Sequence, residues 1–180
     1  MNASVRPALT HAGIRVWNLE AMARFYQDAL GLIVSDEGKG PLSGLEFVFM
    51  TAEHDKHHQF VLVAGRSPEQ TESTVFQLSF RLQSLAQLRV VDARAREAGA
   101  TRFVPMSHGN AWSVYFDDPE GNTLEMYVDT PWYVPQPFGD PLDLSLADEQ
   151  IYQQTEARCR ACPGFMPVEQ WREAMLNRLK

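Results

Sequence analysis

The 180-residue chain predicts an α+β fold, in which two tandem βαβββ units are followed by a helical C-terminal extension. An internal repeat and its hydrophobic periodicity lead to this class. HAGIRVWNLEAMARFYQDALGL (residues 11–32) and FQLSFRLQSLAQLRVVDARAREAGA (residues 76–100) each combine a strand-like alternation, a helix cap, a helical stripe and a glycine. We expect the units to cover about residues 8–64 and 74–129, within a domain of residues 1–130.

The first unit begins with an alternating strand from His11 to Trp17. Asn18 is a suitable N-cap for the helix that follows, and Gly31 is a suitable stop. Three further strands are expected near 31–37, 45–51 and 58–64.

The second unit repeats this order, with Ser84 as the cap and Gly99 as the stop of its helix. Its later strands are expected near 101–106, 111–117 and 123–129. In the last of them, Leu124 and its apolar neighbours two residues apart predict one buried face. Glu125 falls on the opposite face, in the middle of the strand.

Residues 131–180 form an extension that starts with a proline- and aromatic-rich segment, which predicts an ordered strap. Ser145 is a candidate cap for a first helix, and VEQWREAMLNRLK predicts a second, amphipathic helix. Surface cover is the simplest role for these helices. A lid or a contact between chains is the alternative, and we expect a homodimer or a higher homo-oligomer.

Composition limits the function. Hydrophobic residues make up 44% of the chain, and the formal net charge is -7, which disfavours nucleic acid and anionic membrane as partners. No apolar run reaches the length of a membrane span, and residues 1–13 lack a signal-peptide core, so we expect a cytoplasmic protein. Cys159 and Cys162 form a lone C-x-x-C, too few ligands for a structural zinc site.

A candidate metal site emerges when the repeats are aligned on their caps. His11 and Gln77 each lie seven residues before the cap, at equivalent positions of equivalent strands. Two units placed side by side, with their first strands meeting, would form a cupped, open mixed sheet around a cavity shared with Glu125. A buried carboxylate is costly unless it is paired or binds a metal. We therefore predict a divalent metal held by His11, Gln77 and Glu125.

The repeat and the ending YFDDPEGNTLEMY resemble the vicinal oxygen chelate superfamily, over about residues 7–130. This superfamily includes glyoxalase I, antibiotic-resistance proteins and the type I extradiol ring-cleaving dioxygenases, whose catalytic module the chain resembles most. DKHHQFVLVAG is similar to their paired-histidine strand, which makes His58 the acid–base residue. The same resemblance assigns Tyr115 to the substrate, His108 in MSHGNAW to the pocket, and Glu125 and His11 to the metal.

The resemblance implies a ring-cleaving dioxygenase that acts on a catechol-type aromatic compound with O2. In such enzymes Fe(II), held by two histidines and a carboxylate, binds both catechol oxygens. Gln77 stands here in place of the second histidine, and its neutral amide oxygen is a weaker donor, so Mn, Ni, Co or Zn are alternatives to Fe(II). Three other functions stay open: an isomerase, lyase or epimerase of the superfamily, a metal-free small-molecule binding protein, and an interaction role centred on the extension.

Overall fold

The computed structural model describes residues 6–179. Residues 1–5 and Lys180, where the predicted domain begins and the predicted last helix ends, lie outside the described part. The chain divides into two compact units, Met1–Glu72 and Ser73–Lys180, called unit 1 and unit 2 below. Each unit is described by itself.

Unit 1 contains one βαβββ motif, with β1 (Ala12–Val16), α1 (Leu19–Leu30), β2 (Ile33–Lys39), β3 (Glu46–Thr51) and β4 (Phe60–Ala64). The predicted cap and stop of its helix are confirmed. Asn18 Oδ1 accepts a hydrogen bond from the Ala21 N–H at 3.0 Å. Gly31 has a left-handed backbone (φ 70°), which only glycine adopts at little cost, and its N–H donates to the Gln27 carbonyl.

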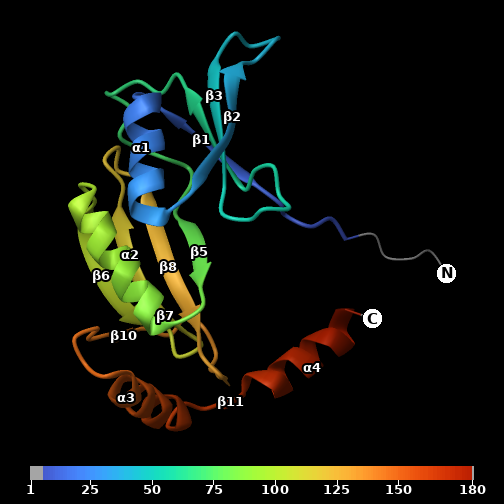
Figure 1. The fold of residues 1–180 in the computed structure, drawn as a ribbon. Coiled ribbons are helices and arrows are strands. Elements are labelled where there is room, and N and C mark those ends of the chain that lie inside the picture. Colours follow the sequence, from blue (N-terminus) through green and yellow to red (C-terminus); the bar gives the residue numbers. More distant parts are fainter. Residues whose placement is uncertain (1–5, 180) are drawn as a thin grey trace, which may run out of the picture. The chain divides into compact units, whose positions relative to one another are not determined.

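The sheet of unit 1 has the strand order β1-β4-β3-β2, in which β1 pairs with β4 in parallel and the other pairs are antiparallel. Helix α1 lies against this sheet (Figure 1). The core between them is apolar and fully buried, and includes Val16, Tyr26, Met50 and Leu62. This packing explains the helical stripe of the sequence.

Unit 2 repeats the motif with β5 (Leu78–Leu82), α2 (Leu85–Glu97), β6 (Thr101–Ser107), β7 (Ala111–Asp117) and β8 (Thr123–Asp129). Ser84 Oγ accepts from the Gln87 N–H at 3.2 Å, as its predicted capping role requires. The C-cap of α2 is Ala98, one residue before the predicted stop, and Gly99 follows with φ 94°.

The sheet of unit 2 has the order β10-β6-β7-β8-β5, with β5 parallel to β8. A tight turn joins β7 to β8, in which Asp118 Oδ1 accepts from the N–H groups of Glu120 and Asn122. Turn geometry of this kind fixes the register of a hairpin. The register places Tyr115 of β7 opposite Glu125 of β8.

The extension belongs to unit 2 and consists of β9 (Trp132–Tyr133), β10 (Asp140–Pro141), α3 (Asp148–Arg160), β11 (Met166–Pro167) and α4 (Val168–Leu179). Strand β9 pairs with β11, and β10 extends the sheet beside β6. Ser145 does not cap α3, because the N-cap is Ala147 and the Ser145 hydroxyl donates to Asp143 instead.

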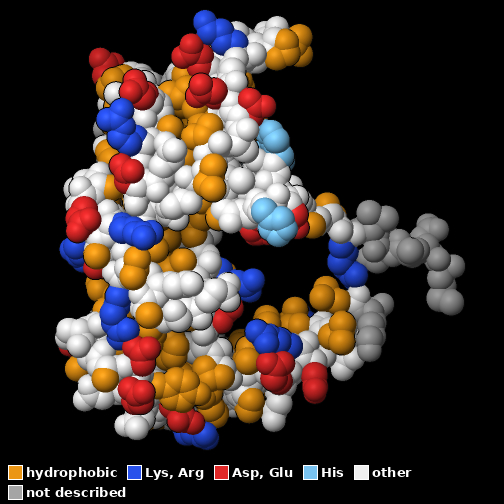
Figure 2. Space-filling model, in the orientation of Figure 1, with side chains coloured by type: hydrophobic (Ala, Val, Ile, Leu, Met, Phe, Trp, Pro, Cys, Tyr) orange, Lys and Arg blue, Asp and Glu red, His pale blue; other side chains and the backbone are white. Residues whose placement is uncertain are grey.

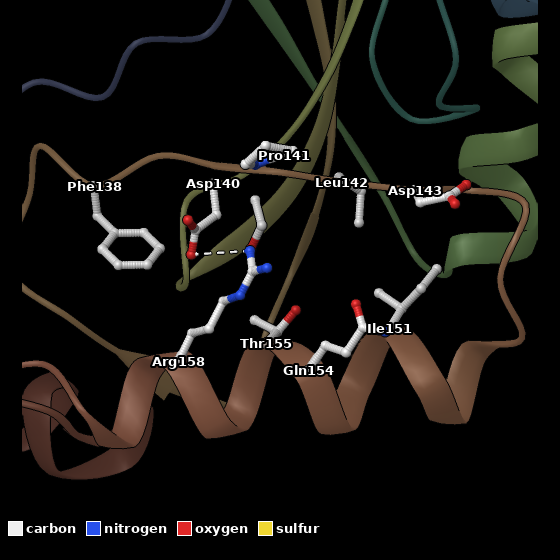
Figure 3. A pocket seen from close by; sticks show the side chains of 10 residues that line it. Phe138, Asp140, Pro141, Leu142, Asp143, Ile151, Gln154, Thr155 and Arg158 are labelled. Carbon is white, nitrogen blue, oxygen red and sulfur yellow. Dashed lines mark ion pairs between the residues drawn. The ribbon is translucent and has the colours of Figure 1, made fainter.

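The strap, defined here as residues 131–141, contacts α3 and α4 through β9. Trp132 is buried, and Tyr133 stacks on Trp171 of α4 with ring centroids 5.5 Å apart. Beneath the strap lies α3, whose Arg158 Nη1 is 3.3 Å from Asp140 Oδ2 at the edge of a cavity of about 20 Å³ (Figure 3). A cavity of that size holds about one water molecule, so strap and helix are closely packed.

The observed architecture confirms the predicted α+β class, with two βαβββ units and a helical extension. Within residues 6–179 both sheets are open. None of the helices in this part of the chain combines the length and the apolar character that a membrane crossing requires.

Candidate functional site

The carboxylate of Glu125 is the centre of a polar cluster in unit 2. Its residue is only 8% exposed, although Leu124 and Met126 on either side pack into the core. Four side chains donate hydrogen bonds to it: Ser113 Oγ (2.8 Å) and Tyr115 Oη (2.7 Å) to Oε1, and Gln77 Nε2 (2.8 Å) and Ser79 Oγ (2.6 Å) to Oε2. A carboxylate has about four acceptor positions, so protein donors satisfy all of them.

Strand register explains why these donors meet. Ser79 of β5 and Tyr115 of β7 are the direct neighbours of Glu125 across the two strand pairings. Gln77 precedes Ser79 by two residues, and Ser113 precedes Tyr115 by two, so each lies on the same face as its partner. Sequence reasoning missed Ser79 and Ser113, but this two-residue period was a signal that could have found them.

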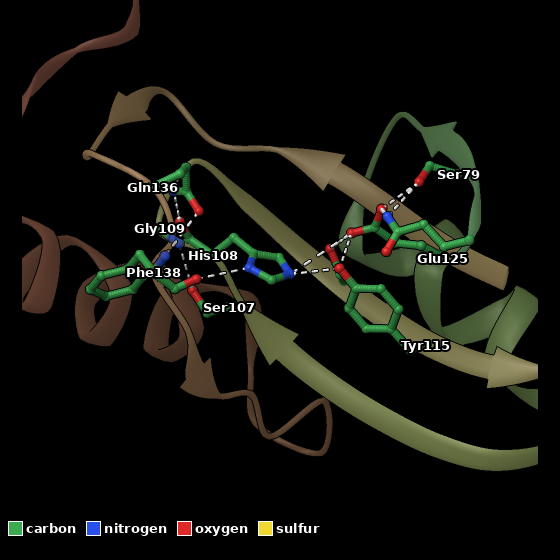
Figure 4. Close-up of polar contacts among 10 residues, drawn as sticks. Ser79, Ser107, His108, Gly109, Tyr115, Glu125, Gln136 and Phe138 are labelled. Carbon is green, nitrogen blue, oxygen red and sulfur yellow. Dashed lines mark hydrogen bonds and ion pairs between the residues drawn. The ribbon is translucent and has the colours of Figure 1, made fainter. Parts of the chain in front are cut away.

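His108 extends the cluster toward the strap (Figure 4). Its Nε2 lies 2.8 Å from Tyr115 Oη and 3.8 Å from Glu125 Oε1. Its Nδ1 lies 2.8 Å from the Phe138 carbonyl oxygen, which can only accept, so Nδ1 carries a hydrogen. The ring therefore connects a backbone carbonyl of the strap to the polar cluster around Glu125.

The Tyr115 hydroxyl lies between two other groups of the cluster, Glu125 and His108. Tyr115 has a single hydroxyl hydrogen and two neighbours that can accept it, Glu125 Oε1 and His108 Nε2. Burial, together with the hydrogen bond to Glu125 and the charge of that carboxylate, raises the pKa of Tyr115 well above its ordinary value. The hydroxyl thus stays protonated and can donate its one hydrogen to either neighbour.

A cavity of about 410 Å³ in unit 2 opens onto this cluster. Its lining includes Gln77, Ser79, His108, Tyr115, Glu125 and Gln136. The volume suits a small organic molecule, and convergent polar groups are typical of binding sites. Gln136 comes from the strap, the segment for which the sequence left a lid over the pocket as one alternative, although it did not single out this residue.

Unit 1 carries the other predicted site residues. His11 is exposed just before β1, and its ring centroid lies 4.6 Å from that of His58, which precedes β4. His57 contributes a third ring, with its Nδ1 2.9 Å from His58 Nδ1. Partial burial, with the charges of His11 and His57, lowers the pKa of His58, which favours the neutral form that a general base needs. Figure 2 shows histidine side chains at the surface.

The structure therefore brings the predicted residues together in two groups. Gln77, His108, Tyr115 and Glu125 share one hydrogen-bonded cluster in unit 2, and His11 and His58 lie side by side in unit 1. The meeting of the two groups stays a prediction.

The donor set fits a divalent metal under one condition. The described residues contain no group of three or more His, Cys, Asp or Glu side chains that could hold an ion, so the predicted site depends on the Gln77 amide. That amide now directs its NH2 group at Glu125 Oε2. If the Gln77 amide turns over, its oxygen faces Glu125 and its hydrogen bond to Glu125 Oε2 is lost. Ser79 still donates to Glu125 Oε2, and Ser113 and Tyr115 still donate to Glu125 Oε1. Imidazole, amide oxygen and carboxylate are all ordinary metal ligands.

The C-x-x-C pair lies at the end of α3, and Cys159 packs near Gly109, where an added Cβ would lie 3.1 Å from its Sγ. Cys159 is buried, and burial raises the pKa of its thiol to about 11. Cys162 donates to the Arg158 carbonyl at 3.3 Å. A buried thiol with a raised pKa is unreactive, which supports a packing role.

Comparison with known proteins adds the family. The family model described as "Glyoxalase/Bleomycin resistance protein/Dioxygenase superfamily" matches residues 8–126. The chain belongs to this superfamily. The match ends just past Glu125, so it includes both βαβββ units and leaves out the extension.

Two curated relatives of the chain in this superfamily come from Rhodococcus globerulus. It is 31% identical over 131 residues to biphenyl-2,3-diol 1,2-dioxygenase 3, and 25% identical over 126 residues to biphenyl-2,3-diol 1,2-dioxygenase 2. The alignments cover 70% and 68% of this chain, and 65% and 63% of the relatives. The chain thus spans less than two thirds of the length of these enzymes.

Solved structures agree on the fold. A glyoxylase/bleomycin resistance protein/dioxygenase domain from Frankia sp. EAN1pec superimposes with a TM-score of 0.59 at 23% identity, covering 70% of this chain and all of that one. The fosfomycin resistance protein FosX from Listeria monocytogenes, solved with Mn(II) and sulfate, gives 0.55 at 19% identity and covers 70% of this chain and 95% of that one. At these identities the likeness concerns the fold alone.

Proposed function

We propose that this protein is a metal-dependent ring-cleaving dioxygenase that acts on a catechol-type aromatic compound. One observation carries the proposal: Glu125, Tyr115 and His108, which the sequence assigns to metal, substrate and pocket, form one hydrogen-bonded line along one cavity. The 31% identity to a biphenyl-2,3-diol dioxygenase supports the substrate class.

In this proposal His11, Gln77 and Glu125 hold the metal, with Fe(II) as the first candidate. When bound, the ion supplies Lewis-acid polarisation of the two substrate oxygens and the redox chemistry that O2 requires. Ser113 and Tyr115 hold Oε1 of the ligand carboxylate, and Oε2, which also accepts from Ser79, would be the coordinating oxygen once the Gln77 amide turns over.

In the proposal, His58, Tyr115 and His108 act on the substrate, as a base or through hydrogen bonds. His58, whose lowered pKa keeps it neutral, accepts the proton of a catechol hydroxyl and later returns it to the product. Tyr115 donates a hydrogen bond from its hydroxyl to a substrate oxygen in the cavity, and His108 Nε2, which carries no hydrogen in the Nδ1–H tautomer, is an acceptor beside it. The line from His108 to Glu125 thus offers one donor and two acceptors to a substrate in the cavity.

A second candidate function is supported by the same cluster. Because four protein donors satisfy Glu125, the carboxylate is stable with no metal ligand role at all. In that case the cavity of about 410 Å³ would bind a small molecule, with Gln77, Tyr115 and His108 as its hydrogen-bonding groups.

The decisive experiment combines metal content with oxygen uptake. Protein purified without chelator is analysed for metals, then loaded with Fe(II) under reducing conditions and assayed in an oxygen electrode with catechol and biphenyl-2,3-diol. We expect one O2 consumed per diol and a yellow ring-opened product. His58→Ala should lower turnover by a factor on the order of 10²–10⁴, with diol affinity little changed, since a proton shuttle acts in the transition state.

The alternatives predict other results. Bound Mn, Ni, Co or Zn without oxygen uptake would favour an isomerase or lyase, and diol binding without metal would favour the second candidate. Gln77→His should tighten metal binding, whereas His11→Ala and Glu125→Ala should abolish most of it. Unchanged metal content in both alanine variants would rule out the three-ligand site.

A further inference from the structure

The strap touches the candidate site through a closed set of hydrogen bonds around His108. Gln136 Nε2 donates to the His108 carbonyl oxygen at 2.8 Å, and Gln136 Oε1 accepts from the Phe138 N–H at 3.1 Å. The Phe138 carbonyl then accepts from His108 Nδ1 at 2.8 Å. The Gln136 side chain thus joins the backbone of His108 to the residue that holds its ring (Figure 4).

The turn that carries His108 is itself pinned against the strap. His108 lies between β6 and β7, where its N–H donates to the Ala111 carbonyl at 2.8 Å. Gly109 follows with φ 71°, and a Cβ at this position would lie 2.5 Å from Val134 Cγ2. The Gly109 carbonyl accepts from Thr130 Oγ1 at 2.6 Å. Neither the turn nor the strap can shift without the other.

The strap in turn has anchors elsewhere in unit 2. Val134 is fully buried, and Asp140 pairs with β6 and lies 3.3 Å from Arg158 of α3 (Figure 3). The carbonyl of Phe138 is therefore held in place, because the strap is anchored before it at Val134 and after it at Asp140. An acceptor fixed in this way selects one tautomer and one orientation of an imidazole.

We propose that the strap residues Gln136 and Phe138 position His108, by fixing its Nδ1–H tautomer so that Nε2 faces Tyr115 and Glu125. Gln136 and Phe138 are positioning residues, since they act through His108. The inference rests on the proposed function for its effect on turnover. Its structural part, the tautomer and orientation of the ring, is independent of metal and substrate. It also gives a role in the site to the extension, which the superfamily match does not cover.

The test is the tautomer of His108 in metal-free protein, from imidazole nitrogen–proton correlation NMR at a fixed pH. The chain has five histidines, and the signals absent from His108→Gln identify the ring. We expect a hydrogen on Nδ1 in the wild type. Gln136→Met keeps the side-chain length but removes both hydrogen bonds, and should replace the single form by a tautomer mixture. Because Gln136 is exposed, this variant should keep its fold.

Gln153→Met is the matched control, since Gln153 is an exposed glutamine of α3 outside this set of hydrogen bonds. It should leave the His108 signals unchanged. In the iron-loaded enzyme with biphenyl-2,3-diol, Gln136→Met should lower kcat about tenfold with KM within about twofold, as expected when an outer residue loosens a site group. Gln153→Met should change neither constant.

Each outcome decides the matter. A wild-type His108 without hydrogen on Nδ1, or a Gln136→Met spectrum like the wild type, would overturn the positioning role. Unchanged kcat in Gln136→Met would overturn its importance for the reaction. If the tautomer changes as expected but the wild type consumes no O2, the positioning role stands and the proposed function fails.

Discussion

The two βαβββ units can be compared at one row of residues that crosses equivalent strands. Strand pairing defines the rows as Gly13–Val61–Phe49 in unit 1 and Ser79–Glu125–Tyr115 in unit 2. The central side chains are almost equally buried, Val61 at 7% and Glu125 at 8% exposed. One backbone plan thus supports an apolar row in one unit and a carboxylate with hydroxyl donors in the other.

The neighbours decide which central residue is tolerated. Gly13 and Phe49 offer no polar side-chain atom to Val61, whereas Ser79 and Tyr115 each donate to Glu125. A carboxylate loses much of its hydration on burial, and hydrogen bonds of this kind offset that cost. The comparison teaches that burial alone does not choose between valine and glutamate, because the donors on the flanking strands do.

The substitution with the largest expected effect is Val61→Glu, which tests whether the row of unit 1 tolerates a carboxylate. It buries a carboxylate where the row provides no donor, and should lower the free energy of unfolding by about 4 kcal/mol or more. Urea denaturation of this variant and of Ile33→Glu, on the exposed part of β2, provides the measurement and its control. Ile33→Glu should change stability by less than about 1 kcal/mol. Equal effects of the two substitutions would contradict the importance of the donors.

Glu125→Val converts the row of unit 2 into that of unit 1, and is the next largest change. It leaves the buried Ser113 hydroxyl and the other donors without their acceptor, so we expect a loss of about 2–4 kcal/mol in urea denaturation. Adding Ser113→Ala and Tyr115→Phe should recover part of this loss, because the unpaired hydroxyls are then absent. A triple variant less stable than Glu125→Val would argue against this cause.

Tyr115→Phe removes one donor and should cost about 1–2 kcal/mol. It should also change the alkaline limb of stability. The pKa of Tyr115 is raised in the folded protein, so above the pKa of an unfolded tyrosine only the unfolded state loses this proton. Stability of the wild type therefore falls as pH rises past about 10, and the variant should fall less steeply. Parallel curves of denaturation midpoint against pH would exclude this contribution.

Phe49→Tyr makes the reciprocal change in unit 1, and should have the smallest effect. Phe49 is half-buried and faces the rings of His57 and His58, and its partners on the neighbouring strands are Val61 of β4 and the exposed Asp36 of β2. Its stability should stay within about 0.5 kcal/mol of the wild type in the same assay. A loss of stability as large as that of Tyr115→Phe would mean that the position in the row, and not the hydrogen bonds made there, determines the change in the free energy of unfolding.

Local patterns predicted most of the fold and part of the site. Asn18 and Ser84 cap their helices as expected, because an N-cap depends on a few neighbouring residues. The prediction failed at Ser145, where the hydroxyl bonds Asp143 instead. Ser145 and Asp143 both favour local hydrogen bonds, and the sequence does not say whether the Ser145 hydroxyl will bond to Asp143 or cap the helix.

In the cluster around Glu125, too, the sequence predicts some residues and not others. Tyr115 and Glu125 follow from motif and alternation, and Ser79 and Ser113 could have followed from the two-residue period of their strands. The contact of Gln136 and Phe138 with His108 could not, because it joins residues about thirty positions apart through a loop without periodicity.

Local patterns were enough to predict the two βαβββ units and a glutamate on the face opposite Leu124 and Met126 in the last strand of the second unit, because periodicity and caps act over a few residues. The superfamily was predicted from the resemblance of two motifs and is shown by the family model. Only the tertiary structure decided that four donors meet at that glutamate and that the strap holds His108. Such contacts depend on strand register and on packing between distant segments, where a difference of one residue or of about 1 Å changes which atoms meet.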